Sequence, residues 1–432
     1  MADAAVFVGV DAGATFIRPG LLRGGSFVLG EPVDSKAALG ANAYVHQIKA
    51  AVDGLLAREG VDDSVVSGFC VAVPGPVSFD GRVSLPNVVG VGDFDMRHVL
   101  RAAFGSRVFL INDADASALG AAEHINVRRL RVNHGGVLTV TLGTGVGGGF
   151  VLPGKELALL SGYEGVACEL GHMKVVDEPF KCGCGATGCL ETVASGNGIV
   201  RVAKARLKEA LLSTLPEAFG GLSGLAAASR TSPHKVAEAV FSAASGGDPL
   251  ATRVLRSASF GGFLPREKLR DGALRDDVIS YEAAKAAFHG RRCWLLALGQ
   301  VDGEDVSAAY RRGRLSASDV RGRVDGIGFT SFDVDRLAVD GDGLCQDVLF
   351  FAASVLGGAL ADVAGVLNPE VIAVTGGLTD LRYREFFRTV EESFQRRVFS
   401  PAARVHWVKL RPHEHVGVSG AVRYAQLKVA KK

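Results

Sequence analysis

The stretch Val137-Leu-Thr-Val-Thr-Leu-Gly-Thr-Gly-Val-Gly-Gly-Gly-Phe-Val-Leu152 predicts a strand, a Gly/Thr turn over Gly143–Gly149 and a returning strand. The chain opens on the same pattern. There the buried-type strand Val6–Val10 runs into Asp11-Ala-Gly-Ala-Thr15 and a second apolar run, Phe16–Leu22. Turns of small residues present several backbone N–H groups to a phosphate. Two such hairpins, about 130 residues apart, predict two similar domains that face one cleft and contact the phosphates of one nucleotide. The absence of a Lys and of a following helix separates the second turn from a Walker loop.

Between the hairpins, the strand Val108–Ile111 ends at Asn112-Asp113-Ala-Asp115, and a helix is expected over Ala114–His124. A carboxylate at the C-terminal end of a strand, just before a helix, lies where ligands bind in open α/β sheets. The local sequence leaves Asp113 open between a ligand contact and a helix cap, and it favours the cap for Asp115. Asp11, at the end of the first strand, is placed near any Mg²⁺ that accompanies a phosphate.

Downstream, Glu169-Leu-Gly-His172 and Cys182-Gly-Cys-Gly-Ala-Thr-Gly-Cys-Leu-Glu191 bring three cysteines and a histidine within 18 positions. Four N/S ligands in a small glycine-rich loop match tetrahedral Zn²⁺ and leave no position for water, which makes the metal structural. The alternative is three unrelated buried cysteines beside a solvated histidine. A rigid zinc knot would fix the flanking carboxylates Glu169 and Glu191 as hydrogen-bond acceptors, as a polyol-binding site requires.

The composition indicates a soluble protein. The 432 residues are enough for two or three domains, and 48% hydrophobic with 22% charged residues is ordinary for a globular chain. A net charge of +2 gives no electrostatic argument for nucleic acid or an anionic membrane, and the Arg run at 311–314 reads as a solvated face. Seven cysteines suit a reducing compartment. With no basic leader and no long apolar run, a cytoplasmic location is expected, without a membrane or nucleic-acid partner.

The remaining chain alternates helices and strands and then loses its regularity. Helices are expected over Asn42–Arg58, Ile199–Leu212, Pro233–Ser245, Asp347–Val366 and Gly417–Leu427, and strands over Gly68–Val73, Val371–Val374 and Arg404–Val408. The more charged region from about Ser213 to Arg336 is interpreted as an inserted helical element. Thr375-Gly-Gly377 again puts bare backbone at the C-terminal end of a strand.

These motifs together resemble the ROK family (repressor, open reading frame, kinase), whose enzymes are ATP-dependent sugar kinases. The match covers about residues 5–200 and 337–427. The resemblance implies an α/β, two-domain actin-like ATPase (ribonuclease H-like) fold with a zinc knot and a large helical insertion. The N-terminal domain would span residues 1–118, joined by the C-terminal helix at about 410–432. The larger domain would span 119–409, with the zinc knot at 172–189 and the insertion within about 213–336.

The same resemblance implies a role for each residue of the site. Asp113 falls on the catalytic base of the family, which raises it above the helix-cap interpretation. Nucleotide contacts fall on Asp11, Gly13, Thr15, Gly143, Thr144, Gly145, Gly376 and Gly377. Sugar contacts fall on Asn87, Asn112, Glu169, His172 and Glu191. Metal ligands fall on His172, Cys182, Cys184 and Cys189, so His172 would serve zinc and sugar through different ring nitrogens. The implied cofactors are ATP, Mg²⁺ and structural Zn²⁺, and the implied assembly is a homodimer.

Three residues depart from the family pattern. Ala14 replaces a residue that is usually glycine, Phe16 replaces a common lysine, and Cys168 replaces the glycine that usually precedes Glu169. Alanine at position 14 costs little if its φ is negative, but it would crowd a phosphate if φ is positive. The insertion has no family counterpart.

The expected function is ATP-dependent phosphorylation of a hydroxyl group on a hexose or N-acetylhexosamine, with Asp113 as general base. Glucose, N-acetylmannosamine and N-acetylglucosamine would meet similar acceptors. A catalytically weak sugar-binding protein is the alternative suggested by Ala14 and the insertion. A sugar-sensing regulator would need a DNA-binding helix-turn-helix ahead of the first strand, where Val6 leaves no room.

Overall fold

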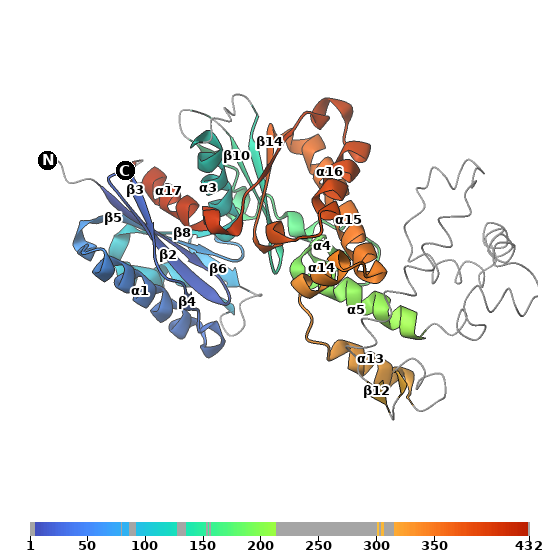
Figure 1. The fold of residues 1–432 in the computed structure, drawn as a ribbon. Helices are drawn as coiled ribbons and strands as arrows, with labels where there is room; N and C mark the ends of the chain where they lie inside the picture. Colours follow the sequence, from blue (N-terminus) through green and yellow to red (C-terminus); the bar gives the residue numbers. More distant parts are fainter. Residues whose placement is uncertain are drawn as a thin grey trace, which may run out of the picture. The chain divides into compact units, whose positions relative to one another are not determined.

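The computed structural model describes residues 5–78, 80–85, 92–127, 135–152, 154, 157–212, 300–301, 304–305 and 315–430 (Figure 1). These residues belong to two compact units. The first unit comprises Met1–Ser195, Leu356–Asp380 and Ser393–Lys432, and the second comprises Gly196–Val355 and Leu381–Glu392. The domain boundary expected near residue 118 stays a prediction. Every predicted site residue that the structure describes lies within the first unit.

The described part of the first unit contains two large sheets and one small one. The first sheet has the strand order β3-β2-β1-β5-β8, with β4 also paired to β2. Its strands are β1 (Val6–Ala12), β2 (Phe16–Arg23), β3 (Ser26–Leu29), β4 (Val33–Asp34), β5 (Val66–Val73) and β8 (Val108–Asn112). The strands β1, β5 and β8 are parallel, while β2 runs antiparallel to β1. A separate pair of strands consists of β6 (Arg82–Leu85) and β7 (Gly92–Asp95).

The second sheet repeats the first in order and direction. Its order is β11-β10-β9-β14-β15, made of β11 (Ala158–Leu159), β10 (Val146–Leu152), β9 (Val137–Leu142), β14 (Val371–Thr375) and β15 (His406–Lys409). Again an antiparallel hairpin, β9–β10, is followed by two parallel strands. The repeat predicted from the two hairpins is therefore confirmed at the level of sheet topology.

The second hairpin turn is shorter than the sequence predicts, because β10 begins at Val146 and Gly147–Gly149 are paired strand residues. These glycines serve packing. A Cβ at Gly149 would lie 2.7 Å from the Cβ of Ala118, and one at Gly148 would lie 2.6 Å from the carbonyl oxygen of Cys168. Gly147–Gly149 thus let a helix and a loop approach β10 closely, and these three residues are not part of the turn.

Helices cover both faces of the first sheet. One face packs against α1 (Ala41–Arg58) and α2 (Met96–Phe104), and the other against α3 (Asp113–Val127) and α17 (Val416–Ala430). Figure 1 shows α3 and α17 side by side. A Cβ at Gly420 would lie 1.7 Å from the carbonyl oxygen of Ala116, so α17 crosses α3 at van der Waals contact of the backbones. The short α4 (Glu191–Ala194) also belongs to this unit.

The second unit is helical in the part that the structure describes. It contains α5 (Gly196–Leu212), α13 (Ala317–Asp325) and α14 (Ser331–Val339), together with the two-residue strands β12 (Gln300–Val301) and β13 (Glu304–Asp305). α13 and α14 each begin with a capping box, and both pack on α5. The helices α15 (Gly343–Leu367) and α16 (Glu385–Arg397) contribute residues to both units. The helix predicted over Pro233–Ser245 and most of the predicted insertion lie outside the described residues.

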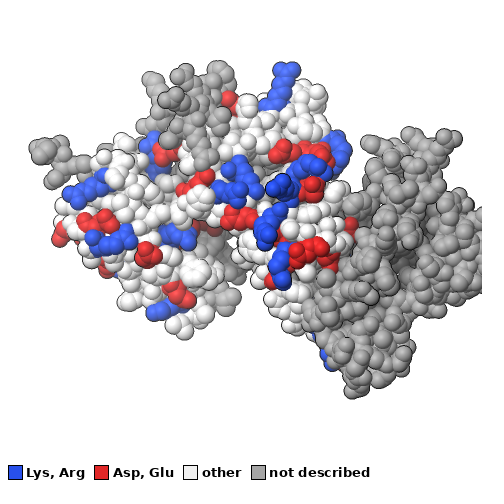
Figure 2. All heavy atoms as spheres, viewed as in Figure 1, with Lys and Arg blue, Asp and Glu red and all other residues white. Residues whose placement is uncertain are grey.

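One described helix, α15, is long and apolar enough to cross a membrane, with 25 residues and a mean hydropathy of 1.8 in its most apolar window. That window is 61% buried inside the protein, which is typical of a core helix and makes this weak evidence for a span. On the face of the molecule in Figure 2, the described basic and acidic side chains are interleaved without a broad patch of one sign. This distribution agrees with the small net charge of +2.

Candidate active site

The first glycine turn connects β1 to β2 and is closed by its own backbone. The N–H of Gly13 donates to the carbonyl of Phe16 over 3.0 Å, and the hydroxyl of buried Tyr44 donates to the carbonyl of Ala12. Among described residues other than glycine, positive φ values occur at Lys36, Glu164, Cys168, Asn368 and His415. Ala14 therefore has an ordinary negative φ, and its substitution for glycine brings no backbone strain.

The second glycine turn, Gly143-Thr-Gly145, connects β9 to β10. The N–H of Gly143 donates to the carbonyl of Gly145 over 3.0 Å, and the Thr144 side chain is exposed at the tip. The N–H of Val146 donates over 3.3 Å to Oε2 of Glu191, and a Cβ at Gly145 would lie 2.4 Å from that oxygen. This turn is therefore joined directly to a predicted sugar-binding carboxylate.

A third glycine pair follows β14, next to the second turn. Because β14 is parallel to β9, Gly376 and the turn after Leu142 leave the same edge of the sheet. Gly376 has φ +97°, and a Cβ there would lie 2.5 Å from the carbonyl oxygen of Leu142. Glycine is required here both for conformation and for close approach.

Asn112 caps helix α3. Its Oδ1 accepts from the backbone N–H of Ala114 over 2.8 Å and of Asp115 over 3.0 Å, while its Nδ2 donates to the carbonyl of Gly75 over 3.0 Å. The interpretation of Asp115 as the helix cap is therefore wrong, because Asn112 satisfies the N–H groups that the cap must satisfy. The cap fixes the backbone from which Asp113 projects.

Asp113 lies among other carboxylates. Burial raises the pKa of Asp113 to about 7, with further contributions from the charges of Asp11 and Glu169, against a hydrogen bond from the N–H of Ala114. Burial also raises the pKa of Asp11, opposed by the positive charge of Arg18. The first and third parallel strands of the sheet thus bring two acidic groups together at their C-terminal ends.

Glu169 precedes a single 3-10 turn, Leu170–His172, that packs against β10. A Cβ at Gly171 would lie 2.1 Å from the carbonyl oxygen of Val146, so this segment reaches the second hairpin at backbone contact. Burial raises the pKa of Glu169, with His172 opposing the shift and Glu191 adding to it. Four of the five predicted sugar ligands are described and lie near the two glycine turns, while Asn87 falls outside the described residues.

Three cysteines and His172 form a compact group. Their ligand atoms all lie within 4.8 Å of one another. Sγ of Cys184 is 3.8 Å from Sγ of Cys189, and Sγ of Cys182 is 3.5 Å from Nδ1 of His172. Ligands of a tetrahedral metal with metal–sulfur bonds of about 2.3 Å lie about 3.8 Å apart, so these side chains fit a tetrahedral ion. Gly185 and Gly188, at φ +90° and +75°, supply the left-handed turns that close the loop.

Comparison with known proteins identifies the family of this chain. Residues 7–260 match the ROK family. The chain belongs to the ROK family. The glucokinase of Halalkalibacterium halodurans is 34% identical over 200 residues, and the N-acetyl-D-glucosamine kinase of Erwinia tasmaniensis is 34% identical over 163. These alignments cover 46% and 35% of this chain, and 58% and 52% of the relatives, so the chain spans little more than half of each relative's length.

Solved ROK structures resemble the whole chain. A ROK family glucokinase from Streptomyces griseus, in complex with glucose and AMPPNP, is 25% identical with a TM-score of 0.58 and covers 98% of this chain and 100% of its own. A ROK family transcriptional regulator, a homologue of an Escherichia coli protein, has a TM-score of 0.59 at 18% identity, over 99% of this chain and 82% of its own. The fold is therefore the α/β fold of ROK proteins, of the actin-like ATPase type.

One departure from the ROK pattern has a backbone consequence. Cys168 has φ +60°, the left-handed conformation that glycine adopts without penalty. The family pattern has glycine at this position, so the fold keeps the conformation while this sequence supplies a side chain. Burial raises the pKa of the Cys168 thiol to about 11, with the charges of Asp115 and Glu169 adding to the effect.

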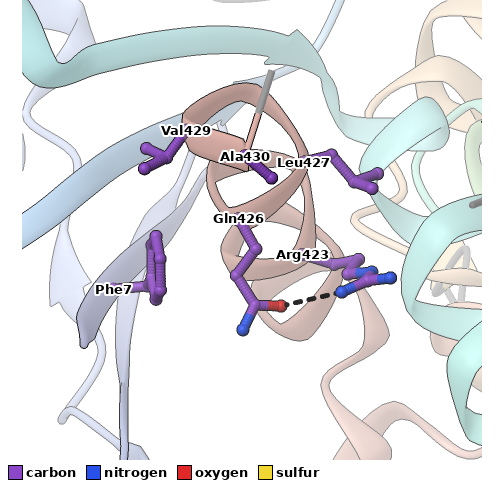
Figure 3. A pocket seen from close by; sticks show the side chains of 6 residues that line it. All are labelled: Phe7, Arg423, Gln426, Leu427, Val429 and Ala430. Atoms are coloured by element: carbon purple, nitrogen blue, oxygen red, sulfur yellow. Dashed lines mark hydrogen bonds between the residues drawn. The ribbon is translucent and has the colours of Figure 1, made fainter. Parts of the chain in front are cut away.

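Sequence reasoning missed two features of this ROK protein. One is the burial of Asp115, which is only 5% exposed. The other is a cavity of about 330 Å³ at the end of α17, lined by Phe7, Arg423, Gln426, Leu427, Val429 and Ala430 (Figure 3). Phe7 and Asp11 both belong to β1 and are four residues apart, so this cavity lies about 13 Å along the strand from Asp11 of the candidate site.

Proposed function

We propose that this ROK family protein transfers the γ-phosphoryl group of ATP to a hydroxyl group of a hexose or an N-acetylhexosamine. The observation that carries the proposal is Asp113, a carboxyl with a pKa of about 7, held at the end of β8 by the Asn112 cap. The named activities of its relatives, glucokinase and N-acetyl-D-glucosamine kinase, support the same reaction class.

Asp113 acts as the general base. Its carboxylate accepts the proton of the sugar hydroxyl while that oxygen attacks the γ-phosphorus, and the bond from phosphorus to the bridging oxygen of ADP breaks. A pKa near 7 is suited to this task, because the group is partly ionised at neutral pH and still basic enough to take a proton. The proton leaves Asp113 to solvent after product release.

The glycine turns bind the nucleotide. Thr15, Thr144 and Gly145 present backbone N–H groups or a hydroxyl to phosphate oxygens. Gly13 and Gly143, whose own N–H groups close the turns, let the backbone approach the phosphates, and Gly376 and Gly377 leave room on the adenosine side. Mg²⁺ would be held with help from Asp11, and it would offset the charge on the phosphates. The raised pKa of Asp11 supports this assignment, because a buried acidic group beside Asp113 is stabilised by a cation.

The sugar is oriented by hydrogen bonds with five residues, in which the carboxylates of Glu169 and Glu191 accept from sugar hydroxyls; the others are Asn87, Asn112 and His172. Asn112 has one amide N–H left for a ligand, since its Oδ1 and its other N–H serve the helix cap and Gly75. His172 turns Nδ1 toward Cys182, which leaves Nε2 for a hydroxyl. Oε2 of Glu191 is held by Val146, so the sugar and phosphate subsites share this carboxylate.

The metal group holds structural Zn²⁺ through His172, Cys182, Cys184 and Cys189. Zinc with four N/S ligands contributes folding energy and has no open position for chemistry. The ligand loop reaches the sugar site at two points, through His172 itself and through Glu191, whose Oε1 is 3.8 Å from Sγ of Cys182. Zinc would therefore hold two sugar contacts in place.

We further propose a cytoplasmic homodimer with the two-domain division at about residue 118. The alternative of a catalytically weak sugar-binding protein loses one of its two reasons, because Ala14 has a negative φ.

A coupled assay of ADP release across a panel of hexoses and N-acetylhexosamines tests the proposal. Sugar-dependent ADP release that Asp113→Asn removes is the expected result, and a panel without any sugar-dependent release contradicts it. Asp53→Asn, an exposed change on α1, is the matched control.

A further inference from the structure

Asp115 is a buried acidic residue that the proposed reaction does not use. It lies in the first turn of α3, two residues after Asp113, and is 5% exposed. Its backbone N–H is bonded to Asn112. Its buried Oδ1 has no hydrogen-bond partner among the residues that the structure describes. A buried carboxylate without a partner is costly, so something at this position must neutralise or solvate it.

The titratable groups that face Asp115 come from three elements. Asp113 belongs to the same helix, Cys168 and Glu169 belong to the loop before Leu170, and Tyr424 belongs to α17. The two charges that act on Asp115, those of Glu169 and Asp113, are both negative. This environment disfavours a third negative charge, and a proton is the smallest species that can remove it.

Burial raises the pKa of Asp115 to about 8, and the charges of Glu169 and Asp113 add to the shift. A neutral carboxylic acid carries an O–H donor, which an ionised one lacks. With that proton, Asp115 leaves Glu169 and Asp113 as the ionised pair at the substrate. Without it, three carboxylates would meet at one end of α3.

We propose that Asp115 is a positioning residue that works in its protonated form, so that Glu169 can orient the sugar and Asp113 can ionise beside it. The positioning role rests on the proposed function, because it requires a sugar substrate. The protonation of Asp115 does not depend on the proposed function. When Asp115 loses its proton, the added charge displaces Glu169 and weakens sugar binding. Asparagine at this position imitates the neutral acid in size and charge.

The first test needs no substrate. Urea unfolding of the wild type and Asp115→Asn is followed between pH 5.5 and 7.5. In this range the unfolded chain ionises Asp115 and the folded chain does not. The unfolding constant of the wild type, divided by that of Asp115→Asn, is therefore expected to rise by up to about tenfold per pH unit, because only the wild type loses stability as the pH rises. Asp53→Asn, an exposed position on α1 whose carboxylate pairs with Lys49 at the surface, is the control, and its ratio should change much less over this range. A flat ratio for Asp115→Asn would overturn the inference, because it would mean that Asp115 is ionised in the folded protein.

The second test separates positioning from a merely structural role. Sugar affinity is measured by calorimetry without nucleotide from pH 7 to pH 9.5, using the sugar that the assay panel identifies. The wild-type affinity is expected to fall about tenfold per pH unit above about pH 8, and this fall should be absent in Asp115→Asn and in the smaller neutral variant Asp115→Ser. An equal alkaline fall in all three proteins would refute the positioning role. If the panel identifies no sugar, the proposed function fails, and the unfolding test still decides the protonation of Asp115.

Discussion

Replacing Asp113 by asparagine separates the chemistry of the site from its stability. The asparagine side chain is nearly isosteric with aspartate and can still hydrogen-bond a sugar hydroxyl, but it cannot take up a proton. Proton removal by a positioned base is worth about 10²–10⁴ in rate, so kcat should fall at least about a hundredfold while sugar affinity changes much less. In the wild type, a base with a pKa of about 7 predicts that kcat falls about tenfold per pH unit below pH 7.

The same substitution should make the protein more stable at neutral pH. The folded-state pKa of Asp113 is raised from 3.8 to about 7, so folding favours the protonated form. The contribution of this group to stability is complete below about pH 4 and is lost as pH rises through 7. A shift of about three pH units corresponds to at most about 4 kcal/mol, shared with Asp11, so a gain of about 1–4 kcal/mol is expected for Asp113→Asn at pH 8.

Both effects are measurable on one preparation. Steady-state kinetics between pH 5.5 and 9 give kcat and KM for the sugar, and urea unfolding at pH 8 gives the change in free energy of unfolding. Asp53→Asn should leave kcat unchanged and lower the free energy of unfolding by no more than about 0.5 kcal/mol, since it removes only a surface ion pair with Lys49. A variant that keeps kcat within about threefold of the wild type would refute the assignment of Asp113 as base. A variant that is less stable at pH 8 would refute the raised pKa.

Three further predictions concern the loops around the site. Cys184→Ser should release one metal ion per chain, measured by elemental analysis, and lower Tm by more than about 5 °C; a metal-free protein of full stability would contradict the zinc assignment. Cys168→Gly should raise Tm by up to a few degrees, because glycine removes the penalty of about 1–2 kcal/mol for a left-handed backbone. Part of this gain is offset by the larger conformational entropy of glycine in the unfolded chain. Cys168→Ala keeps the backbone strain and should not raise Tm. Gly145→Ala should raise the sugar KM about tenfold or more, because its methyl group would displace Oε2 of Glu191; Gly143→Ala, whose added methyl meets no atom within 4 Å, should affect the sugar KM much less.

The fold was predictable because its signals are local. The first strand of each hairpin is a short run rich in apolar and β-branched residues, and a turn of small residues follows at once. The duplicated pattern of β1–β2 and β9–β10 can therefore be read without tertiary information. The turn boundary at Gly143–Gly149 was not predictable in the same way. Whether Gly147 turns or pairs depends on Ala114, which packs against it from another part of the chain.

The site shows the same division between local and distant signals. Asn112, Asp113 and Asp115 are all good helix caps, so the local sequence cannot choose among them. The choice is made by Gly75, whose carbonyl binds the amide of Asn112 and fixes its orientation. The raised pKa of Asp115 likewise depends on burial and on the charge of Glu169, more than 50 residues away, which local reasoning cannot place. The left-handed φ of Cys168 did have a signal, since a glycine usually stands there.

The repetition of the two sheets is incomplete at one strand end, and this asymmetry gives the molecule its chemical polarity. The strand that corresponds to β8 in the second sheet is β15. β8 runs into Asn112 and Asp113, whereas β15 runs into Leu410 and Arg411, whose guanidinium is 3.2 Å from Asp380. The same arrangement of strands thus ends at a carboxyl group in the first sheet and at an Arg–Asp ion pair in the second. The two sheets share one plan but are not chemically equivalent, because a carboxyl that could take up a proton follows the last parallel strand of only the first sheet.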